Sequence, residues 1–153
     1  MAQAYPKSEF VGMDNHEKAL EKARALSESF GLSNIAFINQ DAAEIREASK
    51  FGQSFDYVCA FDAIHDQSHP LDALRGVKYM LRDGGLFSMI DIKAATNIKD
   101  NTDHPMGPFL YTVSLMHCMP IGLNENGSGL GMMWGKQQAI DLLKQAGFST
   151  VCV

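Results

Sequence analysis

The feature that most constrains the fold is a regular alternation of short apolar runs with segments of helical periodicity. The run at 55–61, FDYVCAF, is almost continuously apolar, as in a parallel strand buried on both faces. Further strand-like runs lie at 9–14, 35–38, 86–92 and 148–153. Apolar residues at three- and four-residue steps predict helices over 17–30, 42–48, 71–81, 109–119 and 135–146. This order predicts an α/β fold with a doubly wound, mostly parallel sheet joined by right-handed crossovers.

One connection is much longer than the others. The segment 93–134 exceeds an ordinary strand-to-helix connection and contains the helical candidate at 109–119, so we expect a cap-like insertion. Its apolar side chains could line a pocket for an acceptor, with Trp134 closing it, although apolar residues at helical spacing more often form ordinary core. The residues concerned are Phe109, Leu110, Tyr111, Val113, Leu115, Met116 and Met119.

Size and composition indicate one globular domain over residues 1–153. Hydrophobic residues make up 46% and charged residues 20% of the 153, and a chain of this length buries roughly two-thirds of its unfolded surface. The net charge is -5 and no basic cluster stands out, which argues against a nucleic-acid partner. No run approaches the ~18 apolar residues of a membrane span. Three scattered cysteines suit a reducing compartment, so we expect a cytoplasmic protein.

Polar residues follow each predicted strand at the edge where ligands of such sheets bind. Asp14 ends the first strand, Asp41 follows the second, and the third runs into 61–66. Ligands sit beyond the carboxyl ends of parallel strands, at the switch in strand order. A carboxylate there can accept hydrogen bonds from both hydroxyls of a ribose, and Asp14 is the best candidate. The competing interpretation is that Asp14 caps the helix that follows.

Four segments carry a resemblance to a known family: FVGMD (10–14), INQDAAE (38–44), SFDYVCAFDAIHDQSHP (54–70) and MLRDGGLFSMID (80–91). In composition and spacing they resemble the class I S-adenosylmethionine-dependent methyltransferases, which have a Rossmann-like fold. The resemblance covers nearly the whole chain.

The resemblance implies roles for individual residues. Asp14 would hold the ribose hydroxyls of S-adenosylmethionine, with Asn15 beside it. Asp41 would accept the adenine amino group, and the backbone N–H of Ala42 would face the ring. The methionine portion would be bordered by Phe61 and Asp62.

The chain departs from the family at its beginning. The family starts with a strand and a G-x-G-x-G loop, and nothing before Glu9 matches them, so we expect a truncated domain whose sheet lacks its usual first, central strand. Three arrangements then remain open: the strands at 9–14 and 55–61 pair directly, a gap remains, or another chain fills the gap. The G-x-G-x-G at 127–131 lacks a preceding apolar strand, so we interpret it as a hinge or turn beside the substrate pocket. We expect cofactor binding by this chain to be weak or absent.

His65 has two interpretations. It lies close to the expected point of methyl transfer, where a histidine can serve as general base for a hydroxyl or phenol acceptor. It could instead be structural and hold the loop in place. His65 and His69 form H-x-x-x-H, which suits zinc on a helix, but this stretch is irregular in pattern and we expect no metal site.

Two functions are therefore carried forward. The first is an S-adenosylmethionine-dependent methyltransferase acting on a small molecule, crippled by truncation. The second is a non-catalytic remnant or interaction module of the same fold. A short-chain reductase is excluded because none of Tyr5, Tyr57, Tyr79 and Tyr111 has a lysine four residues later.

Overall fold

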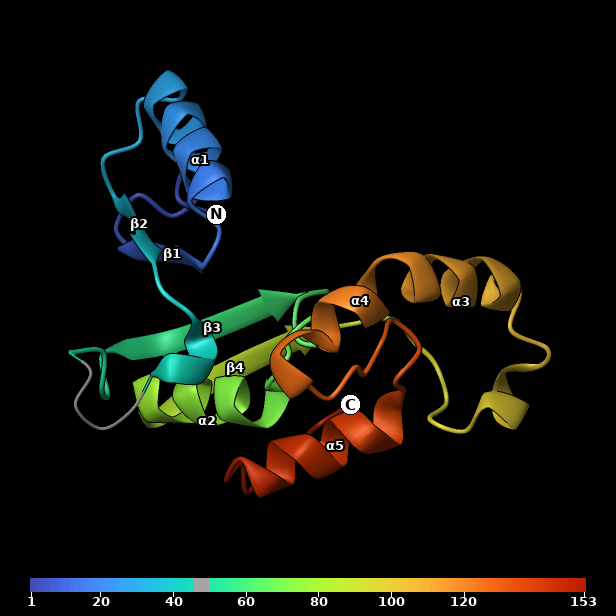
Figure 1. Cartoon of the computed structure of the whole chain (residues 1–153). Coiled ribbons are helices and arrows are strands. Elements are labelled where there is room, and N and C mark those ends of the chain that lie inside the picture. The colour runs from blue at the N-terminus through green and yellow to red at the C-terminus, as the bar shows by residue number, and fades with distance from the viewer. Residues whose placement is uncertain (46–49) are drawn as a thin grey trace.

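The computed structural model describes residues 1–45 and 50–153. Helices and strands alternate along the first part of the chain, and the helices of the insertion and of the C-terminal region follow (Figure 1). The part of the predicted 42–48 helix that is described is a single turn, η1 (Ala42–Glu44), and the remainder lies outside the described residues.

The first structural unit joins two strands and one helix. β1 (Phe10–Asp14) pairs in parallel with β2 (Ile35–Asn39), with Asp14 opposite Asn39, and α1 (Glu17–Ser29) connects them. The side-chain amide of Asn34 fixes the entry to this unit by donating to the carbonyl oxygens of Ala2 and Ser8 at 3.1 and 2.8 Å. Figure 1 shows the unit standing apart from the rest of the molecule.

The second unit repeats the same pattern. β3 (Phe55–Phe61) pairs in parallel with β4 (Leu81–Ile90), and α2 (Pro70–Met80) makes the crossover. β4 begins earlier than the apolar run predicts, because Leu81 already pairs with Phe55 ahead of an irregularity in register. The third and fourth strands expected from the sequence are thus present and parallel.

The two strand pairs do not join. Among the described residues, β1 bonds only to β2 and β3 only to β4. Of the three arrangements left open by the sequence, direct pairing of 9–14 with 55–61 is therefore not observed, and the other two are both consistent with the structure. Contact between the two units is made partly by side chains, since Met13 and Ile38 pack against a core cluster that includes Ile45 and Val77.

A second core cluster lies beneath the C-terminal helix. α5 (Lys136–Gln145) buries Leu143 against Leu74 and Trp134. The prediction of a strand at 148–153 was wrong, because this segment pairs with none of the described strands and is irregular. Phe148 packs its ring on Phe87, with centroids 5.6 Å apart, so its apolar character reflects side-chain packing and not a hydrogen-bonded ladder.

The insertion is largely helical. It contains the short turns η2 (Ile98–Asn101) and η3 (Asn124–Asn126) and the helices α3 (Gly107–Met116) and α4 (Cys118–Gly122). The single predicted helix at 109–119 is thus two helices separated at His117. In the described part of the chain, none of the helices combines the length and the apolar character required to cross a membrane.

Candidate functional site

Asp14 and Asp41 lie at the same edge of the first strand pair. The N–H of Gln40 donates to the carbonyl of Asp14 at 3.0 Å, so the chain reaches Asp41 immediately beside the end of β1. Each carboxylate uses Oδ1 locally: Asp14 accepts from the N–H of His16, and Asp41 from the N–H of Ala43, both at 2.8 Å. A carboxylate has further acceptor capacity on its second oxygen. Asp41 thus caps η1, whereas the N-cap of α1 is His16, so the interpretation of Asp14 as a helix cap was wrong. Both carboxylates keep an oxygen for a ligand.

A glycine on α2 sets the position of η1. A side chain at Gly76 would clash with the carbonyl oxygen of Ala42, so only glycine allows η1 to lie this close to α2. Ala42 is the first residue of η1, where backbone N–H groups point out of the helix. This packing places Asp41 and Ala42 at the junction of the two units.

The end of β3 presents an aromatic ring and an acid. Phe61 is the last residue of the strand, and 54% of its surface is exposed. Asp62 follows with a φ of 52°, a left-handed conformation that Asp tolerates better than most residues. Its N–H donates to the carbonyl of Ile90 at 2.7 Å, which holds the turn against the end of β4.

His65 is buried and surrounded by carboxylates. Only 1% of its surface is exposed, and its Nδ1 lies 2.9 Å from Oδ1 of Asp91. Because a carboxylate accepts, Nδ1 carries the proton of this hydrogen bond. Burial by itself lowers the pKa of His65, but the hydrogen bond to Asp91 and the charges of the neighbouring carboxylates outweigh it, so the pKa is raised above its usual value.

The other ring nitrogen faces a second set of polar groups. Nε2 of His65 lies 3.4 Å from Oδ1 of Asp66, and the buried thiol of Cys118 completes the group. Burial of the Cys118 thiol, with the Asp66 carboxylate beside it, raises its pKa to about 12. The sequence analysis missed Cys118 because it lies more than fifty residues beyond His65 on α4 and belongs to no motif.

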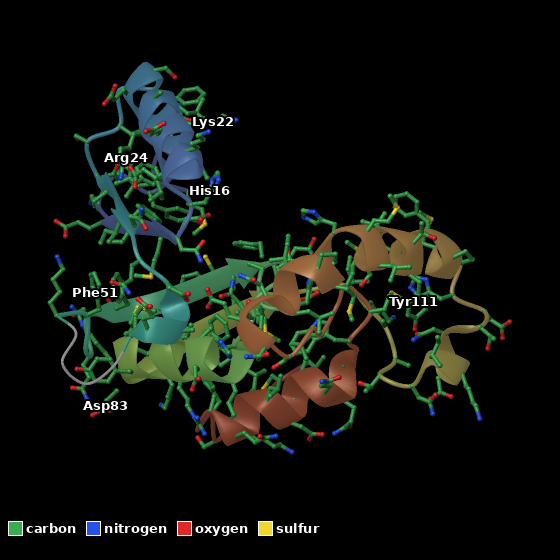
Figure 2. The ribbon with its side chains drawn as sticks, in the orientation of Figure 1. His16, Lys22, Arg24, Phe51, Asp83 and Tyr111 are labelled. Carbon is green, nitrogen blue, oxygen red and sulfur yellow. The ribbon has the colours of Figure 1, made fainter. Side chains whose placement is uncertain are left out.

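An apolar cavity lies within the insertion. It has a volume of about 290 Å³ and is lined by Tyr111, Ser114, Leu115, Met119, Leu130 and Met133. Of the residues expected to line a pocket, Tyr111, Leu115 and Met119 do so. Trp134 does not close this cavity, because it is 3% exposed and packed in the core. Figure 2 shows Tyr111 between α3 and the η2 segment, where the amide of Asn101 donates to its hydroxyl at 3.0 Å.

The glycine-rich stretch at 127–131 is a turn beside this cavity. The N–H of Ser128 donates to the carbonyl of Ser68 at 2.8 Å, and Gly129 and Gly131 have φ values of 55° and 70°. The 3-10 turn η3 precedes it, and α5 begins only at Lys136. A phosphate-binding loop needs a strand before it and a helix directly after it, so this stretch is not one.

The expected site residues thus form two groups. Asp14, Asn15, Asp41 and Ala42 belong to the first strand pair and its exit, whereas Phe61, Asp62 and His65 belong to the second. Among the described residues, no hydrogen bond or ion pair joins Asp14 or Asp41 to the 61–66 turn.

The chain is similar to known methyltransferases over nearly its whole length. Residues 1–147 match the family described as "Methyltransferase domain". The chain is 28% identical over 148 residues to a ubiquinone biosynthesis O-methyltransferase of Ruegeria pomeroyi, covering 94% of this chain and 52% of that protein. It therefore spans about half the length of the curated relative that it matches.

Solved structures show the same fold. A protein from Nostoc punctiforme, provisionally assigned as an O-methyltransferase, superposes with a TM-score of 0.72 at 22% identity, covering 97% of this chain and 41% of that one. The trans-methyltransferase CalH, solved with SAH, superposes with a TM-score of 0.66 at 18% identity, covering 92% and 36%. Together with the family match and the acids at the carboxyl ends of parallel strands, these similarities show that the chain belongs to the class I, S-adenosylmethionine-dependent methyltransferase family.

Proposed function

We propose that the chain provides the adenosine-binding part and the acceptor-facing insertion of a methyltransferase that transfers a methyl group from S-adenosylmethionine to an oxygen of a small molecule. The observation that carries this proposal is the placement of Asp14 and Asp41 side by side at the carboxyl ends of a parallel strand pair. Oxygen as the acceptor atom is suggested by the relative from Ruegeria pomeroyi, whose name is that of an O-methyltransferase.

The residues present fit the adenosine portion of the cofactor. Asp14 is exposed, and its second carboxylate oxygen can accept from the ribose hydroxyls, with Asn15 beside it. Asp41 can accept from the adenine amino group, and the N–H of Ala42 can donate to the ring. S-adenosylmethionine, when bound, supplies an electrophilic methyl group on a sulfonium, and positioning then contributes most of the catalysis.

The second strand pair fits the methionine portion of S-adenosylmethionine less completely than the first pair fits the adenosine. The exposed ring of Phe61 and the carboxylate of Asp62 lie at the correct edge of β3 to border the methionine part. They belong to a strand pair that is not bonded to the one carrying Asp14. This separation supports the expectation that the chain by itself binds the complete cofactor weakly.

His65 is placed better for a structural role than for proton transfer from an acceptor. Its side chain is 1% exposed, and both ring nitrogens face carboxylates of the same chain. A general base must come within hydrogen-bond distance of the acceptor hydroxyl, which would require the surrounding loop to open. We therefore favour the interpretation that His65 fixes the 62–69 loop.

Adenosine recognition can be tested by saturation-transfer NMR with S-adenosylhomocysteine. We expect transfer chiefly to the adenine and ribose protons, and its loss in Asp14→Ala and Asp41→Ala. Asp83→Ala is the matched control, because Asp83 is exposed and lies near the start of β4 in the sequence (Figure 2). Equal transfer in Asp14→Ala and wild type, or transfer confined to the methionine protons, would contradict the proposal.

The second candidate is a non-catalytic interaction module, and the split sheet is the observation that favours it. β1 and β3 each keep an edge without a strand partner among the described strands. An extended segment of another chain could pair with such edges. Methyl transfer from labelled S-adenosylmethionine to p-cresol tests for catalysis directly: incorporation above that of Asp14→Ala supports the enzyme and excludes a purely non-catalytic module.

A further inference from the structure

A mixed group of metal-ligating side chains lies outside the adenosine site. It consists of His65 and Asp66 on the loop after β3 and Cys118 at the start of α4. One ligand atom from each lies within 4.8 Å of the others. His65 and Cys118 are each only 1% exposed, and the side chain of Asp66 is 28% exposed, so the group is largely buried.

One of these atoms is incompletely satisfied. Oδ1 of Asp66 is buried and accepts no hydrogen bond of ordinary geometry among the described residues, and its neighbours are Nε2 of His65 at 3.4 Å and the thiol of Cys118. A buried carboxylate oxygen without a partner is costly, and buried charges in proteins are normally paired or bound to a metal. A cation between Asp66, His65 and Cys118 would satisfy this oxygen.

The spacing fits a tetrahedral ion. Two nitrogen or oxygen ligands about 2.0–2.1 Å from tetrahedral Zn²⁺ lie about 3.3–3.4 Å apart. Nε2 of His65 and Oδ1 of Asp66 are 3.4 Å apart. The nitrogen, oxygen and sulfur donors together favour Zn²⁺ over Mg²⁺ or Ca²⁺, which take oxygen ligands.

The far side of the imidazole is also arranged as in metal sites. Nδ1 of His65 donates to Asp91, whose side chain is 10% exposed. A ligating histidine usually donates its other ring N–H to a carboxylate, which fixes the ring and its tautomer. Asp91 therefore directs Nε2 toward Asp66 and Cys118.

We propose that His65, Asp66 and Cys118 bind one Zn²⁺, with water in the fourth position. Binding converts the Cys118 thiol to a thiolate and releases its proton to solvent. The ion joins the 62–69 loop to α4 and so fastens the insertion to the carboxyl end of β3. Ser68 connects the same two parts by hydrogen bonds. Its hydroxyl donates to the carbonyl of Ile121 on α4, and its carbonyl accepts from the N–H of Ser128 in the 127–131 turn.

This proposal replaces the expectation of no metal site, which considered His65 and His69 with Asp66 and found no cysteine partner in the sequence. His69 precedes α2 as its N-cap and is not a member of the group. The inference rests on the ligand geometry and not on cofactor binding.

The test is a titration of the metal-free chain with Co²⁺, which reports tetrahedral thiolate coordination through visible absorption and a near-ultraviolet charge-transfer band, followed by displacement with Zn²⁺. We expect saturation at one Co²⁺ per chain and loss of the charge-transfer band in Cys118→Ser. Cys152→Ser is the control, because Cys152 is exposed and outside the group. Asp66→Asn should weaken Zn²⁺ binding at least tenfold.

Several outcomes would overturn the proposal: no thiolate band in the wild type, the same band in Cys118→Ser, or its loss in Cys152→Ser. Circular dichroism of the metal-free variants shows whether each of them is folded. If Cys118→Ser fails to fold, the Zn²⁺ affinity of Asp66→Asn becomes the test, and an affinity equal to that of the wild type would contradict the proposed site.

Discussion

Nδ1 of His65 and Oδ1 of Asp91 lie 2.9 Å apart, and this contact holds the loop after β3 against the end of β4. Oδ1 of Asp91 also accepts from the N–H of Ile92 at 2.8 Å, so one carboxylate oxygen fixes both the imidazole and the chain that leaves β4. The buried histidine is thereby made part of the structure that presents Phe61 and Asp62.

Replacing Asp91 by Asn should remove most of the upward shift of the His65 pKa. In metal-free protein the wild-type His65 pKa is raised, so the native state holds its proton more tightly than the unfolded chain. That stabilisation is complete below the unfolded pKa of about 6.5 and is lost as the pH rises through the folded pKa. Urea unfolding from pH 6 to pH 9, with NMR titration of the imidazole, should show this slope in the wild type. An equal slope in Asp91→Asn would contradict the assignment.

Gly76→Ala should destabilise the protein by about 1–3 kcal/mol, although alanine normally favours a helix by about 1 kcal/mol over glycine. The sign is reversed because the new Cβ would meet the carbonyl oxygen of Ala42 and push η1 away from α2. Chemical denaturation measures the change. Arg75→Ala, one residue earlier and exposed, should stay within about 0.5 kcal/mol of wild type. A stabilised Gly76→Ala variant would show that η1 does not pack as described.

Leu74→Ala should cost about 2–5 kcal/mol of unfolding free energy. Leu74 has no exposed surface and packs with Trp134 and Leu143 between α2 and α5. The matched control is Leu26→Ala on α1, where the leucine is 58% exposed and the expected loss is below about 1 kcal/mol. Similar losses for both variants in urea unfolding would mean that the cluster is not the core of this part of the molecule.

A charge at the wall of the apolar cavity should impair binding of an apolar phenol. Leu115 lines the cavity yet is 70% exposed, so Leu115→Asp should fold normally and bind p-cresol at least fivefold more weakly, as measured by ligand-observed NMR. Met116→Asp is the control, because Met116 is 78% exposed on the same helix and does not line the cavity. If both variants bind like the wild type, the cavity is not the acceptor pocket.

The sequence predicted local structure well where the apolar periodicity agreed with residues that typically begin or end a helix or strand. The helix predicted at 71–81 is observed at 70–80, and the strand 55–61 is observed with the same bounds. The predicted strand at 148–153 failed because an apolar run records burial and not hydrogen-bond pairing. Phe148 and Val151 pack by their side chains, and the N–H of Phe148 donates to the carbonyl of Leu143 at the end of α5 and not to a strand.

The site was predictable in part. Acids placed directly after strands predicted that Asp14 and Asp41 share one edge, because the carboxyl ends of parallel strands lie together, and their position in the structure agrees. Their roles in cofactor binding stay predictions. The grouping of Cys118 with His65 could not be foreseen, since it depends on how the insertion folds back over the sheet. Asp91 follows the fourth strand, so its position at the same edge as His65 was predictable, but the burial of His65 and its hydrogen bond to Asp91 depend on tertiary packing that no spacing in the sequence records.

The break between the two strand pairs has a consequence for dynamics. With no backbone ladder between them, the β1–α1–β2 unit is tied to the remainder through the chain at 40–44 and a few apolar contacts. Amides of this unit should exchange with solvent in a separate cooperative step, at lower free energy than those of β3 and β4. Under the proposed function, the residues that bind the nucleoside and those that line the acceptor cavity therefore belong to parts that can open independently of each other.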